Sequence, residues 1–462
     1  MRNRSYVGAL MLLCGLLALP SPAQDSSSAA DNSLSKHMEQ LEQEVRDLQA
    51  QVAALKRKES AESIAETPSE SQRPPSPTGS PSAPVVAQTS LVTAAAPAGA
   101  PPTSQGPSLS SLLGNTTLSG FVDAYYGQNF NNPAGQANGL RFFDGATNQF
   151  GLNLVELVVD KTPDPSNSRT GYHVALGFGQ ALNAVNATEP RAGLAFDQYL
   201  KEAYFSYLAP AGKGLQIDVG KFVTAAGAEV IETKDDWNYS RSILFTYAIP
   251  YFHFGMRAKY AFNDKYSLTG FFVNGWNNVV DNNAGKTYGM SFGWNPNKKF
   301  GIAQTYMAGP EQNVTSSTWR QLSDTIITYS PSSKISFMLN GDYGRGDRYI
   351  VNTQTNLLSP PVFWTGVAGY VKYNFSASSA IATRYEYYDD RDGFTLGTLI
   401  PTHVNEFTAT LERLVAHHII SRMEFRRDIA NQPLFLKGSN PVLNQNTLTA
   451  GLVFMFDSRE AK

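Results

Sequence analysis

Charged side chains gather in one stretch of a chain that is otherwise poor in charge. Asp, Glu, Lys and Arg together make up 16% of the 462 residues. The stretch 224–249 nevertheless carries both signs, with Lys234 and Arg241 among an excess of carboxylates. The acidic set comprises Glu229, Glu232, Asp235 and Asp236. Such groups sort ions and orient dipolar solutes when they line an aqueous path, so we expect this stretch to form an acidic constriction.

A second, basic set lies on segments in which polar and apolar residues alternate. Its members are Arg257, Lys259, Arg384, Arg422 and Arg426. Alternation places them on the same side of their segments as other polar residues, and we expect them to form a basic wall opposite the acidic stretch. Two opposed walls would set a transverse field that passes ions of both signs. The alternative is that Arg384 with Glu386, and Arg422 with Glu424 and Arg426, form ion-pair ladders that brace the wall; both can hold.

Catalytic and metal-binding patterns are not found in the sequence. His417 and His418 are neighbours on a predicted strand, so their rings would point to opposite faces and could not bind one ion. The one G-x-S-x-G match, Gly289-Met290-Ser291-Phe292-Gly293, lies inside the predicted strand 286–294 and not at the strand-to-helix turn of a nucleophile elbow, and the single cysteine is Cys14. The sequence predicts no enzyme, no cofactor and no metal site. A hydrolase built from scattered Ser, His and Asn, and a cell-adhesion role for Arg345-Gly346-Asp347, remain minor alternatives.

The composition divides the chain into two parts. Only one of the 53 aromatic residues, Tyr6, lies in the first 115 positions. After residue 115 the chain holds 29 basic and 29 acidic residues, and the whole chain has a formal net charge of −2. A nucleic-acid-binding protein is therefore not expected. No apolar run after residue 20 approaches the roughly 18 residues of a membrane helix, which excludes a helical membrane bundle.

The aromatic part reads as strands that are apolar on one face and polar on the other. In 251–262, Phe252, Phe254 and Met256 alternate with His253 and Arg257. An apolar face next to a charged face is typical of a membrane barrel with a wet interior. We predict about 16 strands: 117–128, 149–161, 171–180, 198–208, 214–223, 251–262, 266–276, 286–294, 299–308, 318–329, 334–344, 363–374, 380–388, 404–414, 417–427 and 445–456.

The predicted connections alternate between short and long, as in outer-membrane barrels. Short turns include 263–265, 295–298 and 331–333. The long connections are 129–148, 181–197, 224–250, 345–362, 389–403 and 428–444. The predicted fold is an all-β, transmembrane antiparallel barrel over 116–462, wide enough at 16 strands for a water-filled lumen. Aromatic residues near strand ends, such as Trp276, Trp294 and Trp319, would lie at headgroup depth.

Three segments precede the barrel. Residues 1–23 have a basic start, an apolar core and small residues at the end, which predicts a secretory signal peptide. Residues 24–59 contain an apolar heptad stripe from Leu34 to Leu55, which predicts a short coiled-coil helix in the periplasm. Residues 60–115 are rich in Pro, Ala and Ser and predict an extended linker that cannot form a plug domain.

The heptad stripe needs a partner, because one isolated helix cannot bury it. Valine at the a positions with leucine at the d positions favours two strands, whereas barrel porins are usually trimers. We expect a homotrimer, with a dimer as the alternative from the coiled coil alone. A solvated helix without a partner also stays open.

Several pieces between Leu118 and Phe456 resemble the OmpL-like putative outer-membrane β-barrel porin family. They include Gly220-Lys221-Phe222, Asn238-Tyr239-Ser240-Arg241-Ser242, Asn274-Gly275-Trp276, Gly309-Pro310-Glu311, Arg384-Tyr385-Glu386-Tyr387-Tyr388-Asp389 and Arg422-Met423-Glu424-Phe425-Arg426-Arg427-Asp428. The resemblance implies a diffusion channel and does not identify the solute that passes through it.

The sequence as a whole predicts an outer-membrane porin for passive diffusion of small hydrophilic solutes or ions. Its partners would be outer-membrane lipid, those solutes and further copies of itself. The alternative function is a structural tether, in which the coiled coil links the barrel to periplasmic or cell-wall partners.

Overall fold

The computed structural model describes residues 114–189, 197–313, 315–346, 350–352 and 357–461. The predicted signal peptide, coiled coil and most of the linker lie outside the described residues. No helix among the described residues is long and apolar enough to cross a membrane.

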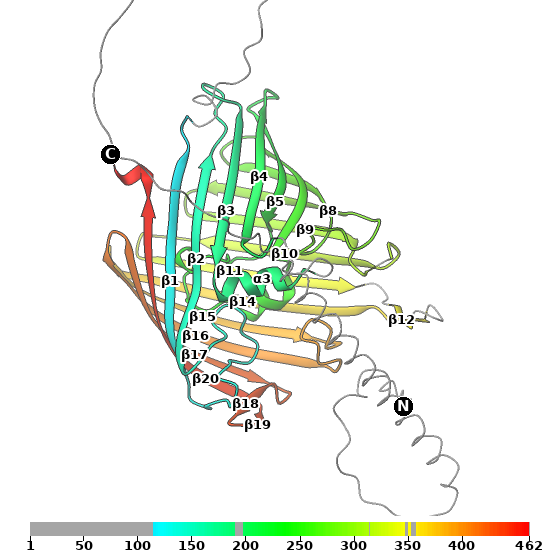
Figure 1. Cartoon of the computed structure of the whole chain (residues 1–462), viewed down its shortest axis with the longest axis vertical. Coiled ribbons are helices and arrows are strands. Elements are labelled where there is room, and N and C mark those ends of the chain that lie inside the picture. Colours follow the sequence, from blue (N-terminus) through cyan, green and yellow to red (C-terminus); the bar gives the residue numbers. More distant parts are fainter. Residues whose placement is uncertain (1–113, 190–196, 314, 347–349, 353–356, 462) are drawn as a thin grey trace, which may run out of the picture. The chain divides into compact units, whose positions relative to one another are not determined.

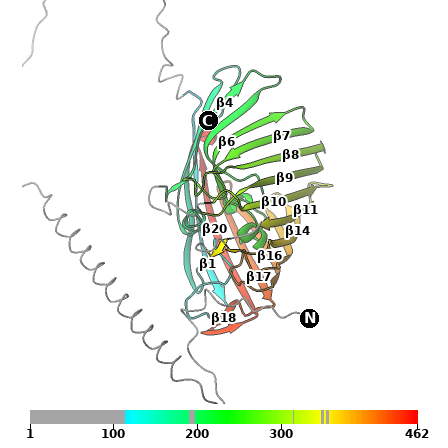
Figure 2. The same ribbon diagram turned by 90° about the vertical axis from the view of Figure 1, so that its right-hand side faces the viewer.

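A closed antiparallel barrel of 16 strands makes up most of the described chain (Figures 1 and 2). Each strand pairs with its neighbours in chain order, and β20 pairs with β1 to close the ring, with Phe121 opposite Met455. Closure leaves no strand edge unpaired in hydrocarbon. The strands are β1 (Thr117–Asn129), β2 (Gln149–Lys161), β3 (Thr170–Phe178), β4 (Leu200–Ala209), β5 (Leu215–Val223), β6 (Phe252–Ala261), β7 (Tyr266–Val273), β8 (Thr287–Asn297), β9 (Phe300–Pro310), β10 (Trp319–Tyr329), β11 (Ile335–Gly346), β14 (Val362–Ser376), β15 (Ser379–Asp390), β16 (Thr402–Ala416), β17 (Ile419–Ala430) and β20 (Asn444–Asp457).

The predicted fold and the number of strands are confirmed, whereas some strand ends differ. The strand predicted over 266–276 ends at Val273, because Gly275 and Asn277 adopt positive φ angles of 151° and 56° and turn the chain. His417 and His418 were expected on a strand, but they form the turn between β16 and β17. The prediction that their rings lie on opposite strand faces was therefore wrong.

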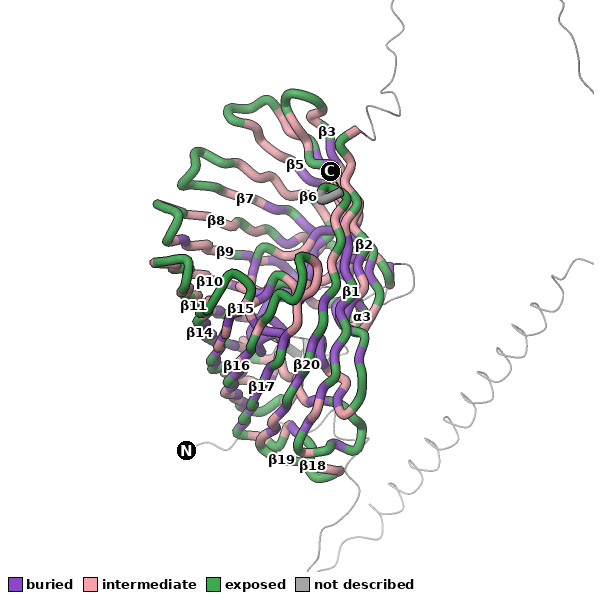
Figure 3. The backbone as a smooth tube through the Cα atoms, turned by 90° about the vertical axis from the view of Figure 1, so that its left-hand side faces the viewer, coloured by how far each residue is buried: buried purple, intermediate pink, exposed green. Residues whose placement is uncertain are grey.

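Burial alternates along the strands, as Figure 3 shows for β1, β2 and β20. The register pairs lumen-facing Asp218 of β5 with Arg257 of β6, while their outward neighbours Val219 and Met256 also pair. Met256 is 44% exposed on the outer face. The two faces of each strand thus meet different surroundings, as the alternation of residue types predicts.

The two ends of the barrel differ. At one end, which we call the short-turn end, successive strands are joined by short turns, for example 262–265, 298–299 and 377–378. The opposite, long-loop end carries the connections 130–148, 179–199, 224–251, 274–286, 311–318, 347–361, 391–401 and 431–443. This is the predicted asymmetry.

Some long connections contain structure of their own. Helix α3 (Gln180–Ala187) lies in a connection that was predicted as a loop, and two hairpins, β12 (Ile350–Asn352) with β13 (Leu357–Leu358) and β18 (Phe435–Lys437) with β19 (Asn440–Val442), rise from others. The connection 224–251 contains η1 (Thr233–Asp235) and the π-helical turn η2 (Leu244–Ala248). We call residues 224–250 the inward segment.

The interior of the barrel is not uniformly wet. In the half toward the long-loop end, Phe271, Met307 and Trp364 of the inner wall join one buried apolar cluster with Leu244 and Phe245 of the inward segment. This differs from the expected water-filled lumen. The physical reason is that apolar residues in the connections cannot reach lipid, and they leave water by packing against apolar positions on the inner wall.

Candidate pore constriction

The inward segment extends across the lumen from its roots at β5 and β6. Tyr239 donates its hydroxyl to Asp123 of β1 at 2.8 Å, and Thr233 accepts from the amide of Asn153 of β2 at 2.8 Å. At the root, Thr224 donates its backbone N–H to the carbonyl of Tyr251 at 3.0 Å. The segment therefore contacts walls that are distant from its own strands in the ring.

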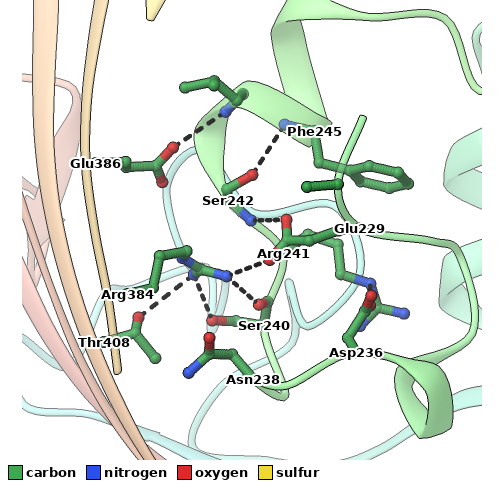
Figure 4. A network of polar contacts seen from close by, with 12 residues as sticks. Glu229, Asp236, Asn238, Ser240, Arg241, Ser242, Phe245, Arg384, Glu386 and Thr408 are labelled. Atoms are coloured by element: carbon green, nitrogen blue, oxygen red, sulfur yellow. Dashed lines mark hydrogen bonds and ion pairs between the residues drawn. The ribbon is translucent and has the colours of Figure 1, made fainter. Parts of the chain in front are cut away.

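Two wall carboxylates each bind a pair of backbone N–H groups of the segment. Glu386 of β15 accepts from Ile243 at 2.7 Å and from Leu244 at 3.1 Å (Figure 4). Glu424 of β17 accepts from the backbone of Tyr239 at 2.5 Å and of Ser240 at 3.0 Å. Because these N–H groups have no ladder partner, the carboxylates satisfy donors that would otherwise be buried and unpaired.

Arg384 of β15 binds the segment from the same wall. Its guanidinium donates to the carbonyl of Ser240 at 2.7 Å and forms an ion pair with Glu229 at 2.6 Å (Figure 4). It also forms an ion pair with Glu406 of β16 at 2.8 Å. The Arg384 side chain is fully buried. A guanidinium with several fixed donors suits this position, because it joins wall and segment in one geometry.

Two more arginines repeat this arrangement on β17. Arg422 donates to the carbonyl of Asp236 at 2.6 Å and pairs with Glu412 at 2.6 Å. Arg426 donates to the carbonyl of Arg241 at 2.5 Å. Three of the five predicted basic residues therefore hold the main chain of the segment.

The acidic and basic sets touch instead of facing each other across water. Glu229 is paired with Arg384, and Asp236 pairs within the segment with Arg241 at 3.1 Å. All four side chains are buried. The expected geometry of two opposed walls does not occur at these residues, because a buried carboxylate requires a partner within contact distance.

The other two carboxylates lie nearer to water. Glu232 pairs with Lys201 of β4, which also contacts Glu156 of β2 at 2.8 Å. Asp235 pairs with its neighbour Lys234 at 2.5 Å, and its side chain is 55% exposed. The sequence could not separate these residues from Glu229 and Asp236, since all four lie in one short stretch.

Arg257 and Lys259 of β6 form a separate cluster away from the arginines on β15 and β17. Both contact the buried carboxylate of Asp218, at 2.8 Å and 3.0 Å. Arg257 also stacks on Phe222, with 4.4 Å from its guanidinium carbon to the ring centre. Two cations on one carboxylate leave an excess positive charge, and the Lys259 side chain is 38% exposed.

The lumen toward the short-turn end is lined by small and polar side chains that remain partly accessible. Examples are Gln216, Thr269, Ser291, Ala303 and Thr328. The alternation of residue types indicates that these positions face inward. It does not predict that they stay accessible to water while the connections occupy the lumen toward the long-loop end.

Sequence reasoning missed several residues that contact the inward segment or belong to it. Asp123, Lys201 and Tyr239 contact the segment or belong to it, and nothing in their spacing predicts this. Glu386 and Glu424 were expected to pair with arginines along their own strands. In the structure Arg384 pairs with Glu229 and Glu406, and Arg422 pairs with Glu412. The two carboxylates instead accept from the segment's backbone. The chain separations of 143 residues between Ile243 and Glu386 and 184 residues between Ser240 and Glu424 give no local signal.

Comparison with known proteins places the chain in a family. The model of the family described as putative beta-barrel porin-2, OmpL-like, matches residues 115–456. A comparison with curated proteins finds no match.

Several solved structures of outer-membrane proteins are similar to this chain at low sequence identity. The anion-selective porin from Comamonas acidovorans is 10% identical with a TM-score of 0.50, and the alignment covers 74% of this chain and 99% of that one. The outer membrane channel DcaP of Acinetobacter baumannii is 10% identical, with a TM-score of 0.47 and coverage of 74% and 97%. OmpT of Vibrio cholerae is 11% identical, with a TM-score of 0.47 and the same coverage. Because the family model spans most of the 462 residues, the chain belongs to the putative beta-barrel porin-2, OmpL-like family of outer-membrane barrels.

Proposed function

We propose that this porin passes small hydrophilic solutes or ions across the outer membrane, with the inward segment as its constriction. The long-loop end would face the outside and the short-turn end the periplasm, which is the usual orientation of such barrels. The N-terminal coiled coil would then lie in the periplasm after removal of the signal peptide.

The observation that carries this proposal is the set of hydrogen bonds and ion pairs by which wall side chains hold the inward segment. A barrel that served only as an anchor would need no inward connection, whereas here Arg384, Arg422 and Arg426 all donate to main-chain carbonyls of the segment. Buried arginines and carboxylates inside a membrane barrel are costly unless they are paired. Their use to position one segment in the lumen fits control of passage.

Selectivity would be set by the charges that water reaches. We assign Glu232 and Asp235 to the acidic side of the path, and Arg257 and Lys259 to the basic side. Glu229, Asp236, Arg384, Arg422 and Arg426 would act indirectly, because they hold the segment in place. No catalytic or cofactor role is proposed for any of these residues.

Homotrimer formation remains part of the proposal, with the predicted heptads of 24–59 as a further contact between copies. The tether function stays as the alternative. It rests on the heptad stripe alone and does not conflict with the channel.

Planar-bilayer recording tests the channel. The purified full chain would be compared with a shortened variant in which a brief Gly-Ser linker replaces residues 229–245. The freed wall charges are then hydrated by water that enters the lumen. We expect stepwise ion conductance from the shortened variant, whether or not the full chain also conducts. If neither protein makes the bilayer conduct, although both migrate as folded barrels, the proposed function is wrong.

A further inference from the structure

The inner wall toward the long-loop end is almost inaccessible to water all the way around the ring. Phe271 of β7 is 8% exposed, and Met307 of β9, Leu322 of β10 and Val404 of β16 are 0–1% exposed. Inward-facing residues of a conducting pore contact water. These residues contact protein.

The material that covers the wall comes from three connections. Ile243, Leu244 and Phe245 of the inward segment are at most 3% exposed. Phe143 of the connection 130–148 packs on Phe245, with ring centres 5.5 Å apart. Leu182 of α3 is fully buried in the same cluster. The three connections and the wall thus make one apolar layer across the barrel.

Such a layer opposes the passage of hydrophilic solutes. A polar group that enters it loses its hydrogen bonds to water without replacement, and apolar constrictions in channels close by excluding water. The path from the short-turn end, lined by residues such as Thr269 and Ser291, therefore ends at this layer.

The inward segment is separable from the wall that it covers. It contains no strand of the barrel, so the hydrogen-bonded ring is complete without it. Its contacts with β15 and β17 are made by wall side chains, which bind main-chain atoms of the segment and the side chains of Glu229 and Ser240, and Gly227 near its start has φ of 93°. Displacing the segment breaks these contacts and the apolar packing, but no ladder bond.

We infer that this structure is the closed state of the channel, and that the inward segment must leave the apolar layer before solutes pass. The inference rests on the proposed function and adds its regulation. It locates the seal at Ile243, Leu244 and Phe245 and not at the ion pairs, which hold the segment at its place on the wall.

A disulfide between the segment and the wall tests the inference. A Cβ atom added at Gly366 of β14 would lie 2.7 Å from Leu244 Cδ1, so the two positions adjoin. The variant is Leu244→Cys with Gly366→Cys, in a chain whose own Cys14 is replaced by serine. We expect bilayer conductance to disappear when this protein is oxidised and to return when it is reduced.

The control disulfide joins two wall positions that do not contact the segment. Thr269 of β7 and Ser291 of β8 are register partners on the inner wall. Thr269→Cys with Ser291→Cys should conduct equally in both redox states. The same protein is recorded oxidised and reduced, so any effect of the substitutions themselves cancels.

The possible results separate the inference from the proposed function. Equal and measurable conductance of the oxidised and reduced Leu244→Cys, Gly366→Cys protein overturns the closed state and leaves the channel standing. A silent wild type with a conducting shortened variant supports the closed state. Silence of the shortened variant as well overturns the channel, and the inference with it.

Discussion

Carboxylates in the inward segment differ in how strongly they stabilise the fold. Glu229 is buried against Arg384, and removal of one partner leaves the other charge buried without its neighbour. Asp235 is 55% exposed, and exposed pairs contribute little. The two residues carry the same charge only a few positions apart, which makes them a matched pair.

We predict that Glu229→Gln lowers the free energy of unfolding by about 3 kcal/mol, whereas Asp235→Asn changes it by less than about 0.5 kcal/mol. Urea unfolding of the barrel in detergent, followed by tryptophan fluorescence, measures both. Equal losses in the two variants would contradict the buried ion pair.

Glu311, directly after β9, links stability to pH. Its carboxylate accepts from the backbone N–H of Trp276 at 2.8 Å and from the hydroxyl of Thr287. Burial raises the pKa of Glu311 from 4.5 to about 7. The folded chain therefore keeps a proton that the unfolded chain releases, and this stabilisation is present below about pH 4.5 and lost as the pH rises through about 7.

Replacement by glutamine removes this dependence. Relative to the wild type, Glu311→Gln should gain stability as the pH rises from about 4.5 to about 7, by about 3 kcal/mol, since one pKa unit corresponds to about 1.4 kcal/mol and the pKa shifts from 4.5 to about 7. Thermal unfolding at a series of pH values measures the difference. A difference that is constant across this range would show that Glu311 does not titrate as described.

At single residues the sequence predicted orientation but not partners. Alternation correctly assigns Arg257 and Asp218 to the inner face, and their contact follows from neighbouring strands. The contact of Arg384 with Glu229 depends on how a long connection folds back, and no local pattern encodes it.

Strands were predictable because period-two alternation repeats along them, over lengths of 8 to 15 residues in the barrel. Helix α3 has only 8 residues and no side-chain cap, so it gave no comparable signal. The apolar residues of the inward segment could have predicted packing inside the barrel, but they were not used in the sequence-based prediction. A run such as Ile243-Leu244-Phe245 in a connection has no lipid to face and must pack elsewhere.

Substitutions at two wall glycines test how the position of Trp364 affects its contact with the segment. Gly344 of β11 faces Trp364 of β14, and a Cβ atom at Gly344 would lie 1.8 Å from that ring. Trp364 Nε1 donates to the carbonyl of Ala248 in the segment at 3.1 Å. A Cβ atom at Gly369 of β14 would have no heavy atom within 4 Å.

We therefore predict that Gly344→Ala destabilises the protein by about 1–3 kcal/mol through displacement of the indole, and that Gly369→Ala has little effect. Unfolding curves of the two variants provide the comparison. Similar stability of both would mean that Trp364 moves without consequence for the segment.

At the scale of the whole molecule, the sequence predicted a barrel because each strand has one face suited to lipid and one suited to water. It did not predict that connections would pack inside the barrel. Closure and strand number follow from alternation and from the length of the connections. Whether a lumen of this width holds water depends on the packing of three connections together, which is a long-range property. The apolar layer therefore appears only in the folded chain.

The central claim is that the two faces of each strand meet different surroundings in a membrane. Neighbouring positions on β7 and β8 test it directly through single cysteines carrying a fluorescent label: outward Leu268 and Phe292, and inward Thr269 and Ser291, which are register partners. In reconstituted vesicles, we predict that brominated lipid quenches the labels at Leu268 and Phe292, while those at Thr269 and Ser291 respond to aqueous iodide. Labels on both faces that respond to the same quencher would contradict a lipid-embedded barrel.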